Sequence, residues 1–559
     1  MTITANQLAD ELTEVLFDAN PIEASALGIR DREDRLPDYT EAGEAAFRSR
    51  LAEIRARADQ AVPAGDQDRV TLAVIRARAE SVLDQLAART VEYTITDSFV
   101  APAVELLMIL PMVGLTEPAH ADGYLARLAG LPTVYEALAE RHRAGIAAGR
   151  LPVHRLTAAT VAYLDRYLAD PASDSLRRPR PTPASTVDLA EFDRERDRLL
   201  AEVVHPALAR YREVLETEVL PHGRPDDRPG LCWLPDGERH YRALARAHTT
   251  TEHSPEQLHQ IGLAQVAGLR EEFAELGSRV IGTTDLQEIF DRLRSDPALR
   301  WRDGDELLNH ARATIERAEQ AAPAWFGRLP EQRCTVEPVP EAEAPGAAAA
   351  YYMSPALDGS RPGVYFANTY RATERGRAPY EATAFHEAVP GHHFQQSLTQ
   401  QLTDLPLLRR VIPFNAYGEG WGLYAERLAD EMGLYSDDLA RLGMLTLDSL
   451  RACRLVVDTG LHANGWSRQQ AVDYLLANTA NPVTEVETEV DRYIAYPGQA
   501  LSYMTGRLEI QRLRAEAQAA LGDRFDIRGF HDTVLGYGEL PLTVLGELVR
   551  GWVERRKVG

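Results

Sequence analysis

Apolar residues recur at three- and four-residue spacing along much of this chain, and this spacing constrains its fold more than any other feature. The segments LADELTEVLFDA and RVTLAVIRARAESVLDQLAAR show the pattern. Such spacing places apolar side chains on one face of an α-helix. Leu, Ala, Arg and Glu, which favour helices, dominate the composition. The sequence therefore predicts a mainly α-helical protein.

Proline-rich stretches interrupt the helical pattern at residues 170–185 and 221–237, where helices cannot continue. One segment, residues 347–370, has a β pattern instead. Two runs of aromatic and β-branched residues flank a turn that contains Pro, Asp, Gly and Ser. This arrangement predicts a β-hairpin.

The charge and the cysteines exclude several classes of protein. A formal net charge of -23 disfavours binding to nucleic acid or to an anionic membrane, because phosphate groups require clustered Lys and Arg. The three cysteines are far apart, which fits a reducing compartment. The first residues lack the basic and apolar regions of a signal peptide, and no stretch reaches the ~20 apolar residues of a membrane span. We expect a cytoplasmic protein with neither nucleic acid nor membrane as partner.

The segment FHEAVPGHHFQ, residues 385–395, resembles a helical zinc motif that has been interrupted. The usual motif places a second His four residues after the first, on the same helical face. Here that position is Pro390, and His392 and His393 follow it. Proline cannot donate the helical hydrogen bond, and Gly391 eases a distortion. A two-residue bulge would bring His392 to the position of the second ligand. The alternative is a solvated or structural His-Glu cluster.

Two histidines need a third ligand to bind zinc. Glu419 and Glu426, which lie seven residues apart in FNAYGEGWGLYAERLADEMG, share one helical face. Glu419 is the candidate ligand. The alternative is that it is an ordinary acidic residue near a helix N-terminus, where such charges are favoured.

Two more segments are candidates for the walls of the site. Arg451, Arg454, Asp458 and His462 form a charged stripe on an otherwise apolar helix, which predicts either a cleft or a self-paired structural ladder. Downstream, Tyr503 and Arg507 share a face four residues apart. A Tyr there can donate to an oxyanion and an Arg can hold a substrate carboxylate. The alternative is a core Tyr and a surface Arg.

Four of these segments together resemble the signatures of one bacterial family, catalogued as domain of unknown function 885. They are HEAVPGHH, EGWGLYAE, RLVVDTGLH and YPGQALSYMTG, and the resemblance covers almost the whole chain. That family is grouped with the gluzincin metallopeptidases, such as thimet oligopeptidase and carboxypeptidase Taq. The resemblance implies a mainly α-helical fold with a deep cleft.

The resemblance also implies roles for individual residues. Matching the Gly-His of the related motifs onto Gly391 and His392 leaves two extra residues here. His386, His392 and Glu419 would then be the metal ligands, with Glu387 as general base. His393 is the competing second ligand. The match of the oxyanion-stabilising Tyr to Tyr503 depends only on its order along the chain.

We therefore expect one unit over residues 1–559, with two helical lobes around a deep cleft and a small sheet or hairpin beside the metal-binding helix. The N-terminal lobe would span 1–220, and the catalytic lobe 250–559. The strand around GVYFANT would be an edge strand able to pair with a peptide. A monomer or a homodimer is compatible with the sequence.

The expected function is hydrolysis of amide bonds in short peptides or small amides, with one Zn²⁺ per chain. Glu387 would act on the zinc-activated water, and Tyr503 or His462 would stabilise the oxyanion. Glu426 or Asp458 would orient a ligand His. Arg454 and Arg507 would contact substrate or support the site.

Two other functions are compatible with the same residues. One is a metal-dependent enzyme of a small-molecule biosynthetic pathway, either an amidase or a non-hydrolytic catalyst. The other is a non-catalytic helical binding protein in which the His and Glu residues are structural.

Overall fold

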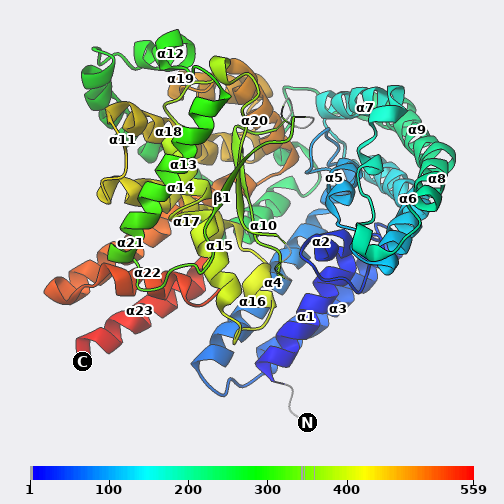
Figure 1. The fold of residues 1–559 in the computed structure, drawn as a ribbon, viewed down its shortest axis with the longest axis horizontal. Coiled ribbons are helices and arrows are strands. Elements are labelled where there is room, and N and C mark those ends of the chain that lie inside the picture. Colours follow the sequence, from blue (N-terminus) through cyan, green and yellow to red (C-terminus); the bar gives the residue numbers. More distant parts are fainter. Residues whose placement is uncertain (1–3, 342–343, 345–346, 358, 360, 559) are drawn as a thin grey trace.

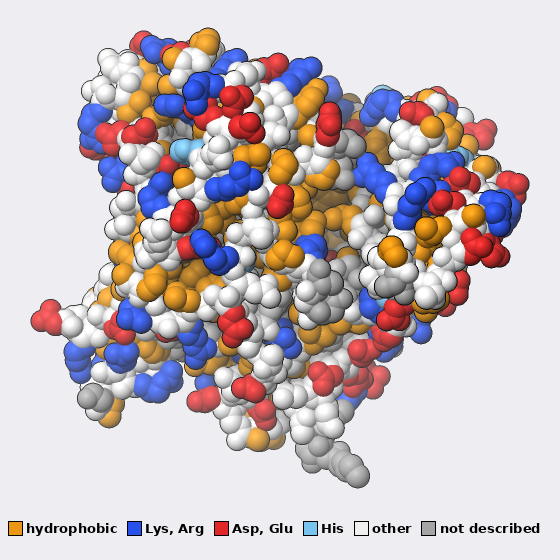
Figure 2. Space-filling view, in the orientation of Figure 1, with side chains coloured by type: hydrophobic (Ala, Val, Ile, Leu, Met, Phe, Trp, Pro, Cys, Tyr) orange, Lys and Arg blue, Asp and Glu red, His pale blue; other side chains and the backbone are white. Residues whose placement is uncertain are grey.

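The computed structural model describes residues 4–341, 344, 347–357, 359 and 361–558. Within these ranges the protein is mainly α-helical and carries one small β-sheet, which confirms the predicted fold class. Figure 1 shows a lobe of helices from the first half of the chain beside a larger body formed by the second half. In Figure 2 the surface is hollowed between these two parts, and hydrophobic side chains line the hollow.

The described residues up to 250 contain ten α-helices. They are α1 (Ala5–Ala19), α2 (Pro21–Ala26), α3 (Glu41–Gln60), α4 (Asp66–Ala88), α5 (Pro102–Ile109), α6 (Pro118–Ala147), α7 (His154–Ala169), α8 (Leu189–Leu199), α9 (His205–Val214) and α10 (Gly237–Thr249).

The described residues after 250 contribute the remaining helices and the sheet. The helices are α11 (Pro255–Val280), α12 (Leu286–Ser295), α13 (Gly304–Ala321), α14 (Tyr380–Glu387), α15 (His392–Gln401), α16 (Leu408–Val411), α17 (Asn415–Glu431), α18 (Asp438–His462), α19 (Arg468–Asn478), α20 (Val483–Ala495), α21 (Ser502–Leu521), α22 (Ile527–Leu535) and α23 (Leu542–Val558). The strands are β1 (Thr335–Pro338), β2 (Ala350–Met353) and β3 (Val364–Ala367).

Three hydrophobic cores hold the helices together. One lies wholly within the first half of the chain and joins α2 to α5–α9. A second is formed mostly by α10–α12 and α18–α20. The third packs α1, α3 and α4 against α13–α17 and α21–α23. The first 220 residues therefore contribute to all three cores, and their first helices are part of the body that carries the second half of the chain.

The sheet contains the predicted hairpin and one strand that was not predicted. β2 and β3 pair antiparallel, which confirms the hairpin; its turn residues 358 and 360 lie outside the described residues. β1 pairs parallel to β3, giving the order β1-β3-β2. The strand within GVYFANT is therefore central, and the prediction that it forms a free edge is wrong. Its partner β1 comes from a distant segment, so no local pattern around residue 364 indicates it.

Helices α17 and α21 approach closely because each has a glycine at their crossing. A Cβ added at Gly420 would lie 2.4 Å from the Cα of Gly506, and one added at Gly506 would lie 1.9 Å from the carbonyl oxygen of Ala416. A larger residue at either position would force the helices apart.

Helix α14 is fixed by a buried carboxylate near its start. Glu381, whose side chain is 1% exposed, accepts hydrogen bonds from Arg317 of α13 at 3.0 Å and from the Ser436 N–H at 2.9 Å. His310 of α13 also lies 3.3 Å from this carboxylate. Burial alone would raise the pKa of Glu381, but its partners, led by His310, lower it to about 2.

The glycine crossing predicts that Gly506→Ala destabilises the protein although alanine favours helices. Overpacking should lower the free energy of unfolding by about 1–3 kcal/mol, measured by urea denaturation. The matched control is Gly268→Ala in α11, where nothing lies within 4 Å of an added Cβ. That variant should be neutral or stabilised by up to about 1 kcal/mol. Equal effects of the two substitutions would contradict the close crossing.

The anchoring of α14 predicts a pH-dependent effect of Glu381→Gln. The folded-state pKa lies below the ordinary value of 4.5, so the ionised carboxylate stabilises the fold above that value and loses its effect as pH falls towards 2. Near pH 7 the variant should lose up to about 3 kcal/mol of unfolding free energy. Urea denaturation between pH 7 and pH 3.5 should show the difference shrinking. The exposed Glu288→Gln should show no such trend.

Candidate metal centre

The His-rich segment forms two helices with a tight break between them. Helix α14 ends at Glu387 and α15 begins at His392, after a cis Val389–Pro390 bond. The expected bulge inside one continuous helix is therefore wrong, because the helix ends and restarts. The Phe394 N–H nevertheless donates to the Ala388 carbonyl, six residues earlier. A helical hydrogen bond joins residues four apart, so this bond spans the two extra residues that the prediction required.

Glycine and tryptophan hold this break together. A Cβ added at Gly391 would lie 1.9 Å from the His386 carbonyl oxygen, so no larger residue fits there without a shift. The indole Nε1–H of Trp421 donates to the carbonyl of Pro390 at 2.8 Å. Through this bond α17 contacts the break directly.

The break brings His386 and His392 to one carboxylate. The Nε2 atoms of both residues lie 3.4 Å from Oε2 of Glu419, and the two rings meet edge to face with centroids 4.7 Å apart. One ligand atom of each of the three residues lies within 4.8 Å of the others. Two imidazoles and one carboxylate form the donor set of a zinc site that leaves a fourth position open.

Glu419 is not a charge at a helix N-terminus. Helix α17 begins at Asn415, and Glu419 lies beyond its first turn, which contains no acidic residue. The alternative explanation of this residue is thus excluded, and its carboxylate points at the two histidines.

Glu426 orients the first histidine, as predicted. Its Oε1 lies 2.8 Å from Nδ1 of His386, which leaves Nε2 facing Glu419. Burial would lower the pKa of His386, but Glu419 and Glu426 raise it to about 9. Burial would likewise raise the pKa of Glu419, whereas the two histidines hold it well below its ordinary value. A carboxylate behind a ligand His is a common feature of metal sites.

Gly422 makes room for this arrangement and was missed by the sequence analysis. A Cβ at this position would lie 2.7 Å from Cε1 of His386, so the ring lies directly on the backbone of α17. The signal was present in the segment EGWG, where a glycine follows the ligand Glu419 by three residues.

Glu387 and Tyr503 flank the cluster on two sides. Oε2 of Glu387 accepts a hydrogen bond from the Tyr352 N–H of β2 at 3.2 Å. The ring of Tyr503, from α21, stacks on His386 with centroids 6.5 Å apart and an interplanar angle of 25°. The role of Tyr352 was also missed, since a backbone donor leaves no mark in a sequence.

His393 lies away from the cluster and is not a ligand. Its Nε2 lies 3.0 Å from the carbonyl oxygen of Gln332, and its Nδ1 lies 3.0 Å from the Tyr352 hydroxyl. Both ring nitrogens are thus engaged. Because successive residues at the start of α15 point in different directions, only His392 faces Glu419.

His462 and Asp458 are structural, and the roles predicted for them are wrong. Nδ1 of His462 accepts from the Leu231 N–H at 3.1 Å, and Nε2 donates to the Tyr493 carbonyl at 2.9 Å. Burial lowers the pKa of His462 to about 4. Asp458 accepts from the Tyr241 hydroxyl at 2.6 Å, and burial raises its pKa to about 7. Neither residue reaches a ligand His or the position of an oxyanion.

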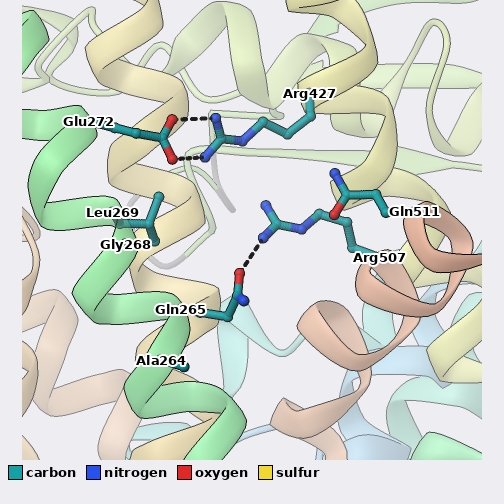
Figure 3. A pocket seen from close by; sticks show the side chains of 8 residues that line it. All are labelled: Ala264, Gln265, Gly268, Leu269, Glu272, Arg427, Arg507 and Gln511. Carbon is teal, nitrogen blue, oxygen red and sulfur yellow. Dashed lines mark hydrogen bonds and ion pairs between the residues drawn. The ribbon is translucent and has the colours of Figure 1, made fainter. Parts of the chain in front are cut away.

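Arg507 is committed to contacts elsewhere, whereas Arg454 lies at the site. Arg507 pairs with the buried Asp448 and donates to Gln265 at 3.3 Å, beside a second pair formed by Arg427 and Glu272. Figure 3 shows these side chains around a pocket of about 270 Å³ between α11, α17 and α21. This pocket does not include the ligands. The guanidinium carbon of Arg454, by contrast, lies 4.4 Å from the ring centroid of Tyr503.

Comparisons with known proteins agree with the family indicated by the sequence motifs. The family model described as "Bacterial protein of unknown function (DUF885)" matches residues 21–549. A solved "putative lipoprotein" from Colwellia psychrerythraea is 28% identical, with a TM-score of 0.90 over 99% of this chain and 100% of that chain. A "putative lipoprotein of unknown function" from Shewanella oneidensis is 18% identical and shows the fold alone, with a TM-score of 0.71 over 98% of this chain and 100% of that chain. A search among curated proteins finds no match.

The predicted cytoplasmic location is wrong, because the descriptions of the two similar solved structures contradict it. Both solved structures carry the description "putative lipoprotein", and lipoproteins are membrane-anchored. A lipid attaches such a protein without any apolar span, so hydropathy could not indicate it. Across the part of the chain that the structure describes, no helix combines the length and the apolar character of a membrane span.

The cluster predicts different effects for the two adjacent histidines. His392→Ala removes an imidazole that faces Glu419 and should abolish tight zinc binding. His393→Ala removes only a structural contact and should leave about one zinc per chain. Both are measured by zinc titration of metal-free protein with calorimetry and by metal analysis after dialysis. Loss of zinc only in the His393 variant would contradict the site described here.

Proposed function

The chain belongs to the bacterial family of unknown function DUF885, and the name of that family gives no activity. From the residues of the site, we propose that the protein is a zinc-dependent hydrolase of amide bonds in short peptides. One observation carries the proposal: two histidines contact one carboxylate while a further Glu directly follows the first histidine. The further carboxylate, Glu387, contacts no cation among the described residues and accepts only a backbone N–H.

The donor set fits zinc better than harder cations. Mg²⁺ and Ca²⁺ take oxygen ligands, whereas His386 and His392 offer nitrogen. His386 is already oriented by Glu426, with Nε2 directed at Glu419. The same ligand types, with a Glu beside the first His, occur in the gluzincin peptidases that the sequence resembles, so we place the protein with them.

His386, His392 and Glu419 would hold the ion. When bound, zinc lowers the pKa of water towards ~7 and polarises a carbonyl. The carboxylate of Glu387 can accept a proton from the attacking water and later deliver it to the leaving amine nitrogen. The Tyr352 N–H holds one carboxylate oxygen at 3.2 Å, which limits the rotation of this side chain.

Tyr503 supplies a donor beside the cluster. Its ring is fixed between His386 and the guanidinium of Arg454. A hydroxyl held in this way can donate to the carbonyl oxygen as negative charge develops there. Burial is the main factor that raises the pKa of Tyr503, so the group keeps its proton at neutral pH and remains a donor.

The site predicts that Glu387→Gln abolishes turnover without loss of zinc. Removing the general base should reduce kcat by about 10²–10⁴-fold, because the amide cannot accept the proton. Turnover is measured by mass spectrometry on a pool of di- to pentapeptides, and zinc by metal analysis. The control is the exposed Glu374→Gln, which should behave as wild type.

Two outcomes would contradict the proposal. One is wild-type turnover in the Glu387→Gln variant. The other is stoichiometric zinc in a wild-type protein that cleaves no peptide in the pool, which would leave a binding protein or an enzyme of small-molecule metabolism.

A further inference from the structure

Two arginines of α18 lie over the ring of Tyr503. The guanidinium carbon of Arg454 is 4.4 Å from the ring centroid, and that of Arg451 is 5.8 Å from it. The two residues are three apart and therefore lie on one face of the helix. The same ring stacks on His386, so both guanidinium groups contact an aromatic ring that also contacts the metal cluster.

Both arginines have donors that no partner uses. Arg454 is 6% exposed, donates to Glu489 at 2.7 Å and to the Tyr493 hydroxyl at 3.0 Å, and has no partner for Nη1 among the described residues. Arg451 is half-buried, and among the described residues it makes one long hydrogen bond, of 3.4 Å, to the Leu447 carbonyl. Its buried Nε likewise lacks a described partner. Unused buried donors are costly, so these positions favour a ligand with acceptor oxygens.

Two of the three arginines near Tyr503 share one carboxylate, which leaves Arg451 without a close ion pair among the described residues. Glu489 is shared between Arg454 and Arg492 of α20, at 2.7 Å and 3.0 Å. In the described part of the chain no carboxylate lies within 4.0 Å of the guanidinium of Arg451, although Glu485 is near enough to interact with it electrostatically. The nearby Glu485 is hydrogen-bonded to Asn481 at 3.0 Å, and burial raises its pKa.

We propose that Arg451 and Arg454 bind the C-terminal carboxylate of the peptide substrate, so that the enzyme cleaves close to that end. Two guanidinium groups with free N–H donors suit a carboxylate, which accepts up to four hydrogen bonds. This inference rests on the proposed function for the reaction, although carboxylate binding can be measured without turnover. The sequence had suggested Arg507 for binding the substrate carboxylate, and this inference assigns that role to the two arginines of α18.

The distances limit how far from the end the cut lies. The His386 ring is 6.5 Å from the Tyr503 ring, which is 4.4 Å from the Arg454 guanidinium. An extended chain covers about 3.5 Å per residue. Three residues or fewer therefore separate the scissile bond from the carboxylate, and the products released from the C-terminus are amino acids, dipeptides or tripeptides.

Binding is tested first, in zinc-loaded Glu387→Gln protein, which should hold a substrate without cleaving it. The probes are a library of N-acetylated tetrapeptides with free C-termini and the same library with C-terminal amides. Peptides retained by the immobilised protein are counted by mass spectrometry. We expect at least tenfold greater retention of the free acids.

Substitutions then assign the effect to the arginines. Arg451→Gln should abolish the preference for free acids while leaving retention of the amides unchanged, and Arg451→Lys should keep part of it because the charge remains. Arg451 is half-buried, so these variants should fold, which circular dichroism checks. Arg441→Gln, on the same helix but paired with Asp430, is the matched control and should keep the full preference.

Each result separates this inference from the proposed hydrolase. Equal retention of acids and amides, including no retention of either, would overturn the carboxylate site. Wild-type cleavage of amidated and free peptides at equal rates would also overturn it and would leave the hydrolase intact. Selective retention of free acids by a protein that never cleaves them would support the carboxylate site and reject the hydrolase.

Discussion

The packing of α17 against the break between α14 and α15 is the constraint on which the site depends. One helix supplies Glu419 to both imidazoles, Glu426 to the rear of His386, and the Trp421 indole to the Pro390 carbonyl. It can do so only because Gly422 lets the His386 ring lie against its backbone and Gly420 lets α21 approach. Tyr503, on α21, thereby reaches the other face of the same ring.

The residues that the sequence placed correctly are those with local patterns. His386, Glu387 and His392 lie within eight positions, and the Pro-Gly pair among them has few explanations other than a break. Glu419 and Glu426 share a helical face by their spacing alone. Such arguments need no knowledge of what packs against the segment.

The failures come from partners that lie far away in the sequence. The charged stripe on α18 predicted either a cleft or a self-paired ladder, but among the described residues its members pair with other elements and not with one another. Its early part, Arg451 and Arg454, faces Tyr503, whereas Asp458 and His462 bind Tyr241 and backbone groups. Likewise, the sequence around β3 does not indicate that β1 pairs with the edge of β3 that β2 leaves open. These outcomes are decided by contacts between segments, which periodicity cannot show.

The core shared by the two ends of the chain has a consequence for biosynthesis. Helix α4 packs against α23 and α1 packs against α16, and α3 belongs to the same core, so these early helices share it with helices that leave the ribosome late. At about 5–20 residues per second, the early helices wait tens of seconds for those partners. During that time the apolar faces of α1, α3 and α4 lack part of their final cover, so the nascent chain is a natural client for chaperones that shield exposed hydrophobic surface.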